Sequence, residues 1–206
     1  MIKDNLQKSS STVSAPTLSS RTCCCTREKA PESTDLRISI RFSMRASISP
    51  ITAHAEKGEF NITLQRDFDA DAGIIELFPQ EITRAFLNLI ANAVYAATRR
   101  KTEHKKSGFE PILRASTKNL GATVEIRIRD NGTGIPAEVR EKMFNPFFTT
   151  KPAGEGTGLG LSMTHDIIVK QHGGKIDVET EPGIFTEFII TLPRAIIAPK
   201  TAGGTN

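Results

Sequence analysis

The sequence predicts an α+β fold, a two-layer α/β sandwich in which two or three helices cover one mixed, mostly antiparallel sheet. Three observations predict it. Apolar and polar residues alternate in several short segments after residue 60, as they do in half-buried strands. A long segment over 79–101 instead has apolar residues at helical spacing. A second helical segment follows Gly160, and helices packed on one such sheet make a two-layer fold.

Two strands and a long helix are expected first along the chain. The segment 60–68, FNITLQRDF, alternates apolar and polar residues, and the short apolar run 74–78 is a candidate second strand. The helix over 79–101 begins with Pro79, a residue that suits the first turn of a helix. A polar loop to about residue 110 follows it.

Two hairpins complete the predicted sheet. Segments 112–119 and 123–130 both alternate and flank a short turn. Segments 175–181 and 185–192 flank a turn at Pro182-Gly183. The helix between the hairpins is expected to end at Gly173-Gly174, since glycine is a common signal at a helix C-terminus.

Composition divides the chain into three parts. The first 50 residues hold 11 Ser and 5 Thr, and their apolar residues stand singly, so we expect residues 1–55 to be disordered or poorly packed. One hypothesis is that this segment results from truncation or a frame disturbance of a longer protein. Residues 56–195 are predicted to form the folded domain, and residues 196–206 a flexible tail.

Charge and hydropathy exclude several function classes. Of 27 Lys and Arg residues, eight lie in residues 1–50, as do four of the 23 Asp and Glu residues. The net charge of +4 therefore belongs to that segment, and the rest of the chain offers no basic footprint for nucleic acid. No apolar run approaches the roughly 18–20 residues that span a bilayer, and no signal peptide is evident. We expect a cytoplasmic protein with no membrane segment, in which the adjacent Cys23, Cys24 and Cys25 are free thiols.

The first candidate binding motif is Gly156-Thr157-Gly158-Leu159-Gly160. Glycines at a helix start let a ligand approach the backbone and aim N–H groups at one point, which suits phosphate. The spacing is neither that of a P-loop nor that of a dinucleotide-binding turn. A flexible surface loop is the alternative.

The second motif is DNGTGIP over 130–136, directly after a predicted strand. Asp130 is a hydrogen-bond acceptor that suits the exocyclic amine of a purine, and Gly134 would let a flat ring approach the backbone. An ordinary Asp-Asn-Gly turn is the alternative.

The third motif is a pair of asparagines in the long helix. Asn88 and Asn92 are four residues apart, so they share a helix face among apolar neighbours. Buried amides without partners cost ~1–3 kcal/mol each, so they need a partner. An amide oxygen here could bind Mg²⁺ that carries nucleotide phosphates. A purely structural hydrogen-bond role is the alternative.

Together these motifs resemble the ATP-binding catalytic domain of sensor histidine kinases. This domain (HATPase_c) belongs to the GHKL superfamily with gyrase, Hsp90 and MutL, and has a Bergerat-type fold. NLIANAVYAA (88–97) resembles the N box, and DNGTGIP (130–136) the first glycine box. FNPFFTTK (144–151) resembles the F box, and GTGLGLS (156–162) the second glycine box. The resemblance covers roughly residues 60–193.

The resemblance implies ATP as the ligand and Mg²⁺ as the cofactor. It makes Asn92 the metal ligand, Asn88 a supporting catalytic group, and Asp130 with Thr186 the contacts of adenine. Phe147 and its neighbours would anchor a lid over about 149–156. The implied nucleotide contacts are Asn88, Asn92, Asp130, Gly132, Gly134, Ile135, Lys151, Gly156, Thr157, Gly158, Leu159, Gly160 and Thr186.

The resemblance also implies transfer to a histidine. Hydrolases of the superfamily have a glutamate where this chain has Asn88, which cannot activate water. None of His54, His104, His165 and His172 lies in the pattern of a phosphoacceptor. We therefore expect a histidine-bearing dimerisation domain elsewhere as the acceptor and a response regulator downstream. The alternatives are a GHKL-type ATPase or serine kinase, and a non-catalytic nucleotide-binding module.

Overall fold

The computed structural model of the chain describes residues 37–40, 43–49, 62–103 and 108–195. All of them fall within one compact unit, Ser33–Asn206. No helix in these ranges has the length and apolar character needed to cross a membrane.

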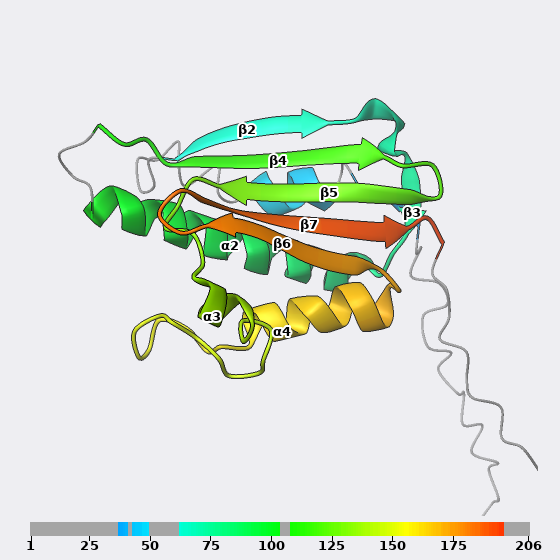
Figure 1. Cartoon of the computed structure of the whole chain (residues 1–206). Coiled ribbons are helices and arrows are strands. Elements are labelled where there is room, and N and C mark those ends of the chain that lie inside the picture. Colours follow the sequence, from blue (N-terminus) through cyan, green and yellow to red (C-terminus); the bar gives the residue numbers. More distant parts are fainter. Residues whose placement is uncertain (1–36, 41–42, 50–61, 104–107, 196–206) are drawn as a thin grey trace, which may run out of the picture. The chain divides into compact units, whose positions relative to one another are not determined.

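A five-stranded sheet forms one layer (Figure 1). Its order is β2-β4-β5-β7-β6, with β2 parallel to β4 and the other pairs antiparallel. This confirms the predicted mixed, mostly antiparallel sheet. The strands are β2 (Thr63–Phe68), β4 (Ile112–Asn119), β5 (Thr123–Asp130), β6 (Lys175–Glu181) and β7 (Phe185–Pro193).

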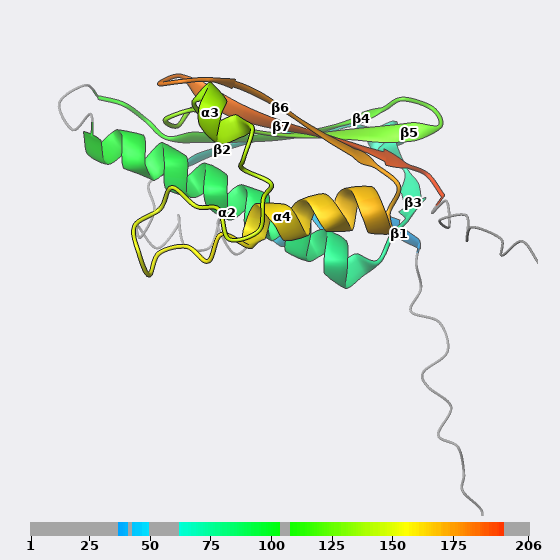
Figure 2. The same cartoon turned by 60° about the horizontal axis from the view of Figure 1, so that its bottom comes forward.

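Helices form the second layer, on one face of the sheet (Figures 1 and 2). The long helix α2 (Pro79–Glu103) lies beside α4 (Gly160–His165), which continues as a π-helical segment, η2 (Asp166–Gln171). The short helix α3 (Ala137–Arg140) follows β5. Alternation in the strands and a 3.6-residue period in α2 direct their apolar faces toward each other, which is why both layers could be predicted.

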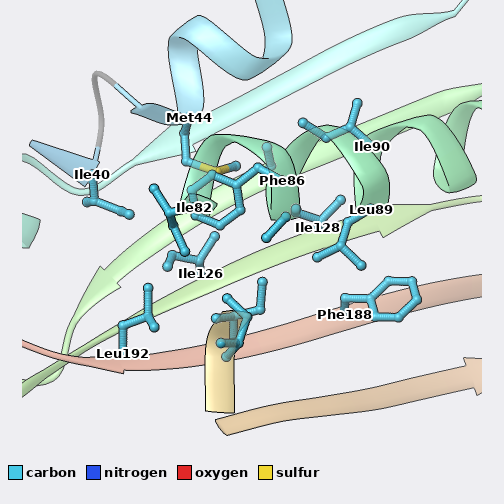
Figure 3. Close-up of a cluster of buried hydrophobic side chains, with 14 of the residues drawn as sticks. Ile40, Met44, Ile82, Phe86, Leu89, Ile90, Ile126, Ile128, Phe188 and Leu192 are labelled. Carbon is cyan, nitrogen blue, oxygen red and sulfur yellow. The ribbon is translucent and has the colours of Figure 1, made fainter. Parts of the chain in front are cut away.

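The core lies between α2 and the inner face of the sheet (Figure 3). Ile82, Phe86 and Leu89 of α2 are completely buried, as are Ile126 and Ile128 of β5. Burying each such side chain stabilises the fold by about 1.5–3 kcal/mol. This packing fixes the face of α2 that is left for the two asparagines.

Residues just before the predicted domain also belong to this core, which corrects the expected poorly packed segment 1–55. The strand β1 (Arg37–Ser39) pairs antiparallel with β3 (Ile74–Glu76), and residues 43–49 are helical. Ile40, Met44 and Ile48 are at most 1% exposed, and Figure 3 shows Met44 beside Phe86. Their four-residue spacing places them on one helix face, a short signal that the serine-rich composition obscured. Residues 1–36, 41–42 and 50–55 of that segment, the tail 196–206 and the three cysteines lie outside the described residues.

Candidate functional site

A pocket of about 380 Å³ opens between α2, the loop after β5 and the segment that leads into α4. Its wall includes many of the predicted contacts: Asn88, Asn92, Ile135, Lys151, Gly156, Thr157, Gly158 and Gly160. Asp130, Gly132, Gly134, Leu159 and Thr186 are not part of this wall. The structure thus gathers the N-box asparagines and the second glycine motif around one cavity.

The two asparagines use their amide groups differently. Asn88 donates its Nδ2–H to the carbonyl oxygen of Gly160, at 3.4 Å, and so links α2 to the first residue of α4. Asn92, one turn further along α2, turns its Oδ1 toward the pocket, where it accepts a hydrogen bond from Lys151 Nζ at 3.0 Å. Asn92 therefore presents an oxygen to a cation, as a metal ligand must, while Asn88 acts as a donor.

Lys151 is the cation of this pocket. Its Nζ lies 4.3 Å from the ring centroid of Tyr95, which follows Asn92 by one turn of α2. Partial burial lowers the pKa of Lys151, whereas the nearby carboxylate of Glu155 raises it. The Tyr95 hydroxyl donates to Glu155 Oε2 at 3.3 Å, so Lys151 and Glu155 contact the same tyrosine.

Asp130 ends β5 and is only 3% exposed. Its Oδ1 accepts the backbone N–H of Gly132 at 2.8 Å, and β7 places Thr186 directly opposite. Burial raises the pKa of Asp130 to about 7, against the lowering effects of the Gly132 N–H and the charge of Arg129. A carboxyl group with this pKa, beside the pocket loop, is a candidate for ligand binding.

The first glycine motif is packed tightly against two neighbours. A Cβ on Gly132 would lie 2.6 Å from the backbone of Ala96 in α2. Gly134 has a φ of +65°, and a Cβ there would collide with the carbonyl oxygen of Glu181 at the end of β6. Both glycines are therefore required by the fold itself, whether or not a base also approaches them.

The structure of the phenylalanine stretch differs from the prediction at Phe147. Phe147 is 74% exposed and has a φ of +65°, so its ring does not anchor the segment. Its neighbours do: Phe144 packs against the core and Phe148 lines the pocket. The backbone of Phe147 lies so close to Gly158 that a Cβ on this glycine would collide with it. The second glycine motif is thereby held against the phenylalanine stretch.

Sequence reasoning missed part of the pocket wall. Val139 and Met143 line it from α3 and the turn after it, and Tyr95 contacts both Lys151 and Glu155 of the wall. The four-residue spacing of Val139 and Met143 after Pro136 was a local signal for a short helix with one apolar face. Nothing local in the sequence pairs Tyr95 with Glu155, which are 60 residues apart.

Comparisons with known proteins place this geometry among ATP-binding domains. A family described as "Histidine kinase-, DNA gyrase B-, and HSP90-like ATPase" matches residues 79–196. The chain is 59% identical over 73 residues to the sensor kinase CckA of Brucella abortus (strain 2308), a match that covers 35% of the chain and 8% of CckA. It is 38% identical over 119 residues to the sensor histidine kinase ZraS of Escherichia coli (strain K12), covering 58% of the chain and 23% of ZraS. The chain thus spans less than a quarter of the length of these relatives.

Solved structures agree. The fold is similar to the nucleotide-free catalytic domain of histidine kinase ThkA, with a TM-score of 0.64 and 28% identity over 77% of this chain and 95% of that one. It is also similar to ThkA in a complex with the response regulator protein TrrA, with a TM-score of 0.62 and 25% identity, covering 79% of this chain and 42% of that one.

Proposed function

Since the chain belongs to the family of histidine kinase-, DNA gyrase B- and HSP90-like ATPases, and has the catalytic-domain fold of sensor histidine kinases, we propose that its pocket binds ATP with Mg²⁺ for phosphoryl transfer to a histidine. The acceptor histidine would lie on a dimerisation domain outside the described residues. The observation that carries this proposal is the pocket in which Asn92, Lys151 and the second glycine motif converge.

The residues present fit a magnesium ion. Asn92 Oδ1 already faces an ammonium group at 3.0 Å, and an amide oxygen is a ligand type that Mg²⁺ accepts. Bound there, the ion would neutralise charge on the nucleotide phosphates, which is the main requirement of phosphoryl transfer. Asn92 would hold it, Lys151 would contact a phosphate, and the residues of 156–160 would offer backbone N–H groups.

Adenine would bind at the end of the site formed by Asp130 and Thr186. We propose that Asp130 accepts the exocyclic amine, with Thr186 opposite it and Ile135 against the base. Thr180 supports this arrangement, because its Oγ1 accepts the Ile135 N–H at 2.8 Å and lies 3.4 Å from Thr186 Oγ1. The loop after β5 is thereby fixed to β6 and β7, the strands that would frame the base.

Transfer to a histidine is favoured over hydrolysis by the chemistry at Asn88. An amide cannot accept a proton near neutral pH, and this one already donates to Gly160. The carboxylate that does line the pocket, Glu155, accepts the hydroxyl of Tyr95. Exclusion of water by a lid would further protect the phosphoryl group.

The described histidines fit structural roles. His172 is 1% exposed, with Nδ1 at 2.7 Å from the Ile167 carbonyl oxygen and Nε2 accepting the Phe78 N–H at 3.0 Å. His165 lies beside Phe144 and near Asp166. His54 and His104 lie outside the described residues. Three expectations stay predictions: a separate acceptor domain, a response regulator as downstream partner, and a cytoplasmic location. The complex of ThkA with TrrA supports the response regulator.

Two substitutions test the pocket. Asn92→Ala is expected to weaken Mg-ATP binding by at least tenfold and leave metal-free ADP binding nearly unchanged, because it removes the proposed metal ligand and leaves the proposed adenine contacts in place. Asp130→Ala is expected to weaken every adenine nucleotide, with or without metal, since it removes the acceptor of the base. Calorimetry with each nucleotide measures both effects. Equal losses of metal-free ADP binding in the two variants would contradict the assignment.

A transfer assay distinguishes the activities. The chain is incubated with γ-labelled ATP and Mg²⁺, with and without a histidine-bearing helical hairpin from a related kinase. Acid-labile label on the hairpin supports the proposal. Phosphate release without transfer would support an ATPase instead, and binding without either would support a non-catalytic module.

A further inference from the structure

Tyr95 lies within the N-box segment 88–97, has no role assigned so far, and contacts two residues of the pocket wall, Lys151 and Glu155. It lies three residues after Asn92, on the same side of α2, and is half-buried. Its ring faces the Lys151 ammonium at 4.3 Å, and its hydroxyl donates to Glu155 Oε2 at 3.3 Å. Both partners belong to the segment between the phenylalanine stretch and the second glycine motif, so one helix residue contacts the lid twice.

The kind of contact matters for the charge of Lys151. Partial burial disfavours an ammonium, and a carboxylate in direct contact would stabilise it but also neutralise it. An aromatic ring stabilises the cation through its quadrupole without neutralising it. Glu155 Oε2 accepts the Tyr95 hydroxyl at 3.3 Å. The Lys151 ammonium contacts the Tyr95 ring and Asn92 Oδ1, 3.0 Å away, and so lies at the pocket wall beside the proposed metal ligand.

From this arrangement we propose that Tyr95 is a positioning residue that holds Lys151 in the phosphate end of the pocket and so makes the site prefer a nucleoside triphosphate over a diphosphate. The inference rests on the proposed nucleotide pocket. A divalent cation held by Asn92 Oδ1 would repel the Lys151 ammonium, so Lys151 would move away from this oxygen when the metal is bound. The ring of Tyr95 keeps the displaced ammonium near, where the terminal phosphate offers it negative charge.

The test compares affinities for a non-hydrolysable ATP analogue and for ADP, each with Mg²⁺. Tyr95→Leu is expected to weaken analogue binding by about three- to tenfold, the scale of a partly desolvated cation–π contact, while ADP binding changes less than about twofold. Tyr95→Phe keeps the ring and is expected to retain the preference. Lys151→Gln should lose it as Tyr95→Leu does, whereas Lys170→Gln, at an exposed lysine of η2, is the matched control.

A second measurement uses the intact protein. Tyr95 is the only tyrosine of the chain, which has no tryptophan, so tyrosine fluorescence reports this position alone. Its emission is expected to change more with the ATP analogue than with ADP, and this difference should disappear in Lys151→Gln. Equal loss of both nucleotides in Tyr95→Leu, or equal fluorescence responses in the wild-type protein, would overturn the positioning role. If the wild-type protein bound neither nucleotide, the proposed function would fall as well.

Discussion

At the scale of single residues, Asp130 combines a structural cost with a proposed binding role. Its carboxyl group is buried, and the folded pKa of about 7 lies far above the 3.8 of an exposed aspartate. A folded-state pKa raised in this way means that the folded protein binds the proton more tightly than the unfolded chain. The stabilisation that the proton on Asp130 gives the folded protein is complete below about pH 4 and is lost as pH rises through 7.

Asp130→Asn should therefore stabilise the protein while weakening the ligand. The amide keeps an acceptor for the Gly132 N–H but removes the buried charge, so we expect about 1–3 kcal/mol more stability at pH 8 and a flatter profile from pH 4 to 8. Metal-free ADP should bind at least tenfold more weakly. Urea unfolding at several pH values and calorimetry measure the two effects. Asp177→Asn, in an exposed ion pair with Lys175 on β6, is the control that should change neither by much.

At the scale of elements, His172 joins the end of η2 to the start of α2. Only the tautomer with its proton on Nδ1 satisfies both contacts, a donated bond to the Ile167 carbonyl and an accepted bond from the Phe78 N–H. The Phe78 ring packs on the imidazole edge, with centroids 5.4 Å apart. Burial lowers the pKa of His172 below 6.5, because the charged form cannot be solvated there. Protonation would also leave the Phe78 N–H without its acceptor.

We predict that this junction makes the fold acid-sensitive. Since the folded pKa of His172 is lowered, its stabilisation is present above about pH 6.5 and is lost as pH falls below that value. His172→Ala should cost about 2–4 kcal/mol at pH 8 and remove this part of the pH dependence. His165→Ala, at a half-buried position at the end of α4, should change stability by less than about 1 kcal/mol and leave the pH dependence in place. A variant of His172 that kept the full acid sensitivity would show that another group is responsible.

At the scale of the whole molecule, local periodicity was sufficient for most elements and insufficient for their assembly. The alternation of 112–119 and 123–130 predicted β4 and β5 to the residue, because each has one buried and one solvated face. The parallel pairing of β2 with β4 joins segments about 50 residues apart, and no local pattern encodes it. The same holds for the pocket. The glycine and asparagine motifs predicted part of its wall, whereas the contacts of Tyr95 depend on how residues 151–155 lie against α2.

The segment before Phe60 provides the last prediction, because composition concealed its packing. Ile40 and Met44 contribute completely buried side chains to the cluster that contains Ile75 and Phe86. A truncated chain that begins at residue 56, the boundary expected from composition, would expose those partners. We expect it to lose several kcal/mol of stability, and Met44→Ala alone to cost about 2–4 kcal/mol.

A chain that begins at Ser33, the first residue of the compact unit, is the matched control and should unfold at the same denaturant concentration as the full chain. Urea denaturation of the full chain and of the chains that begin at residues 33 and 56 measures these differences in stability. Equal midpoints for the chains beginning at 33 and 56 would mean that residues 37–49 add nothing to the core. A lower midpoint only for the shorter chain would show that the ATP-binding domain starts before the family motifs do, and that its stability depends on this short apolar face.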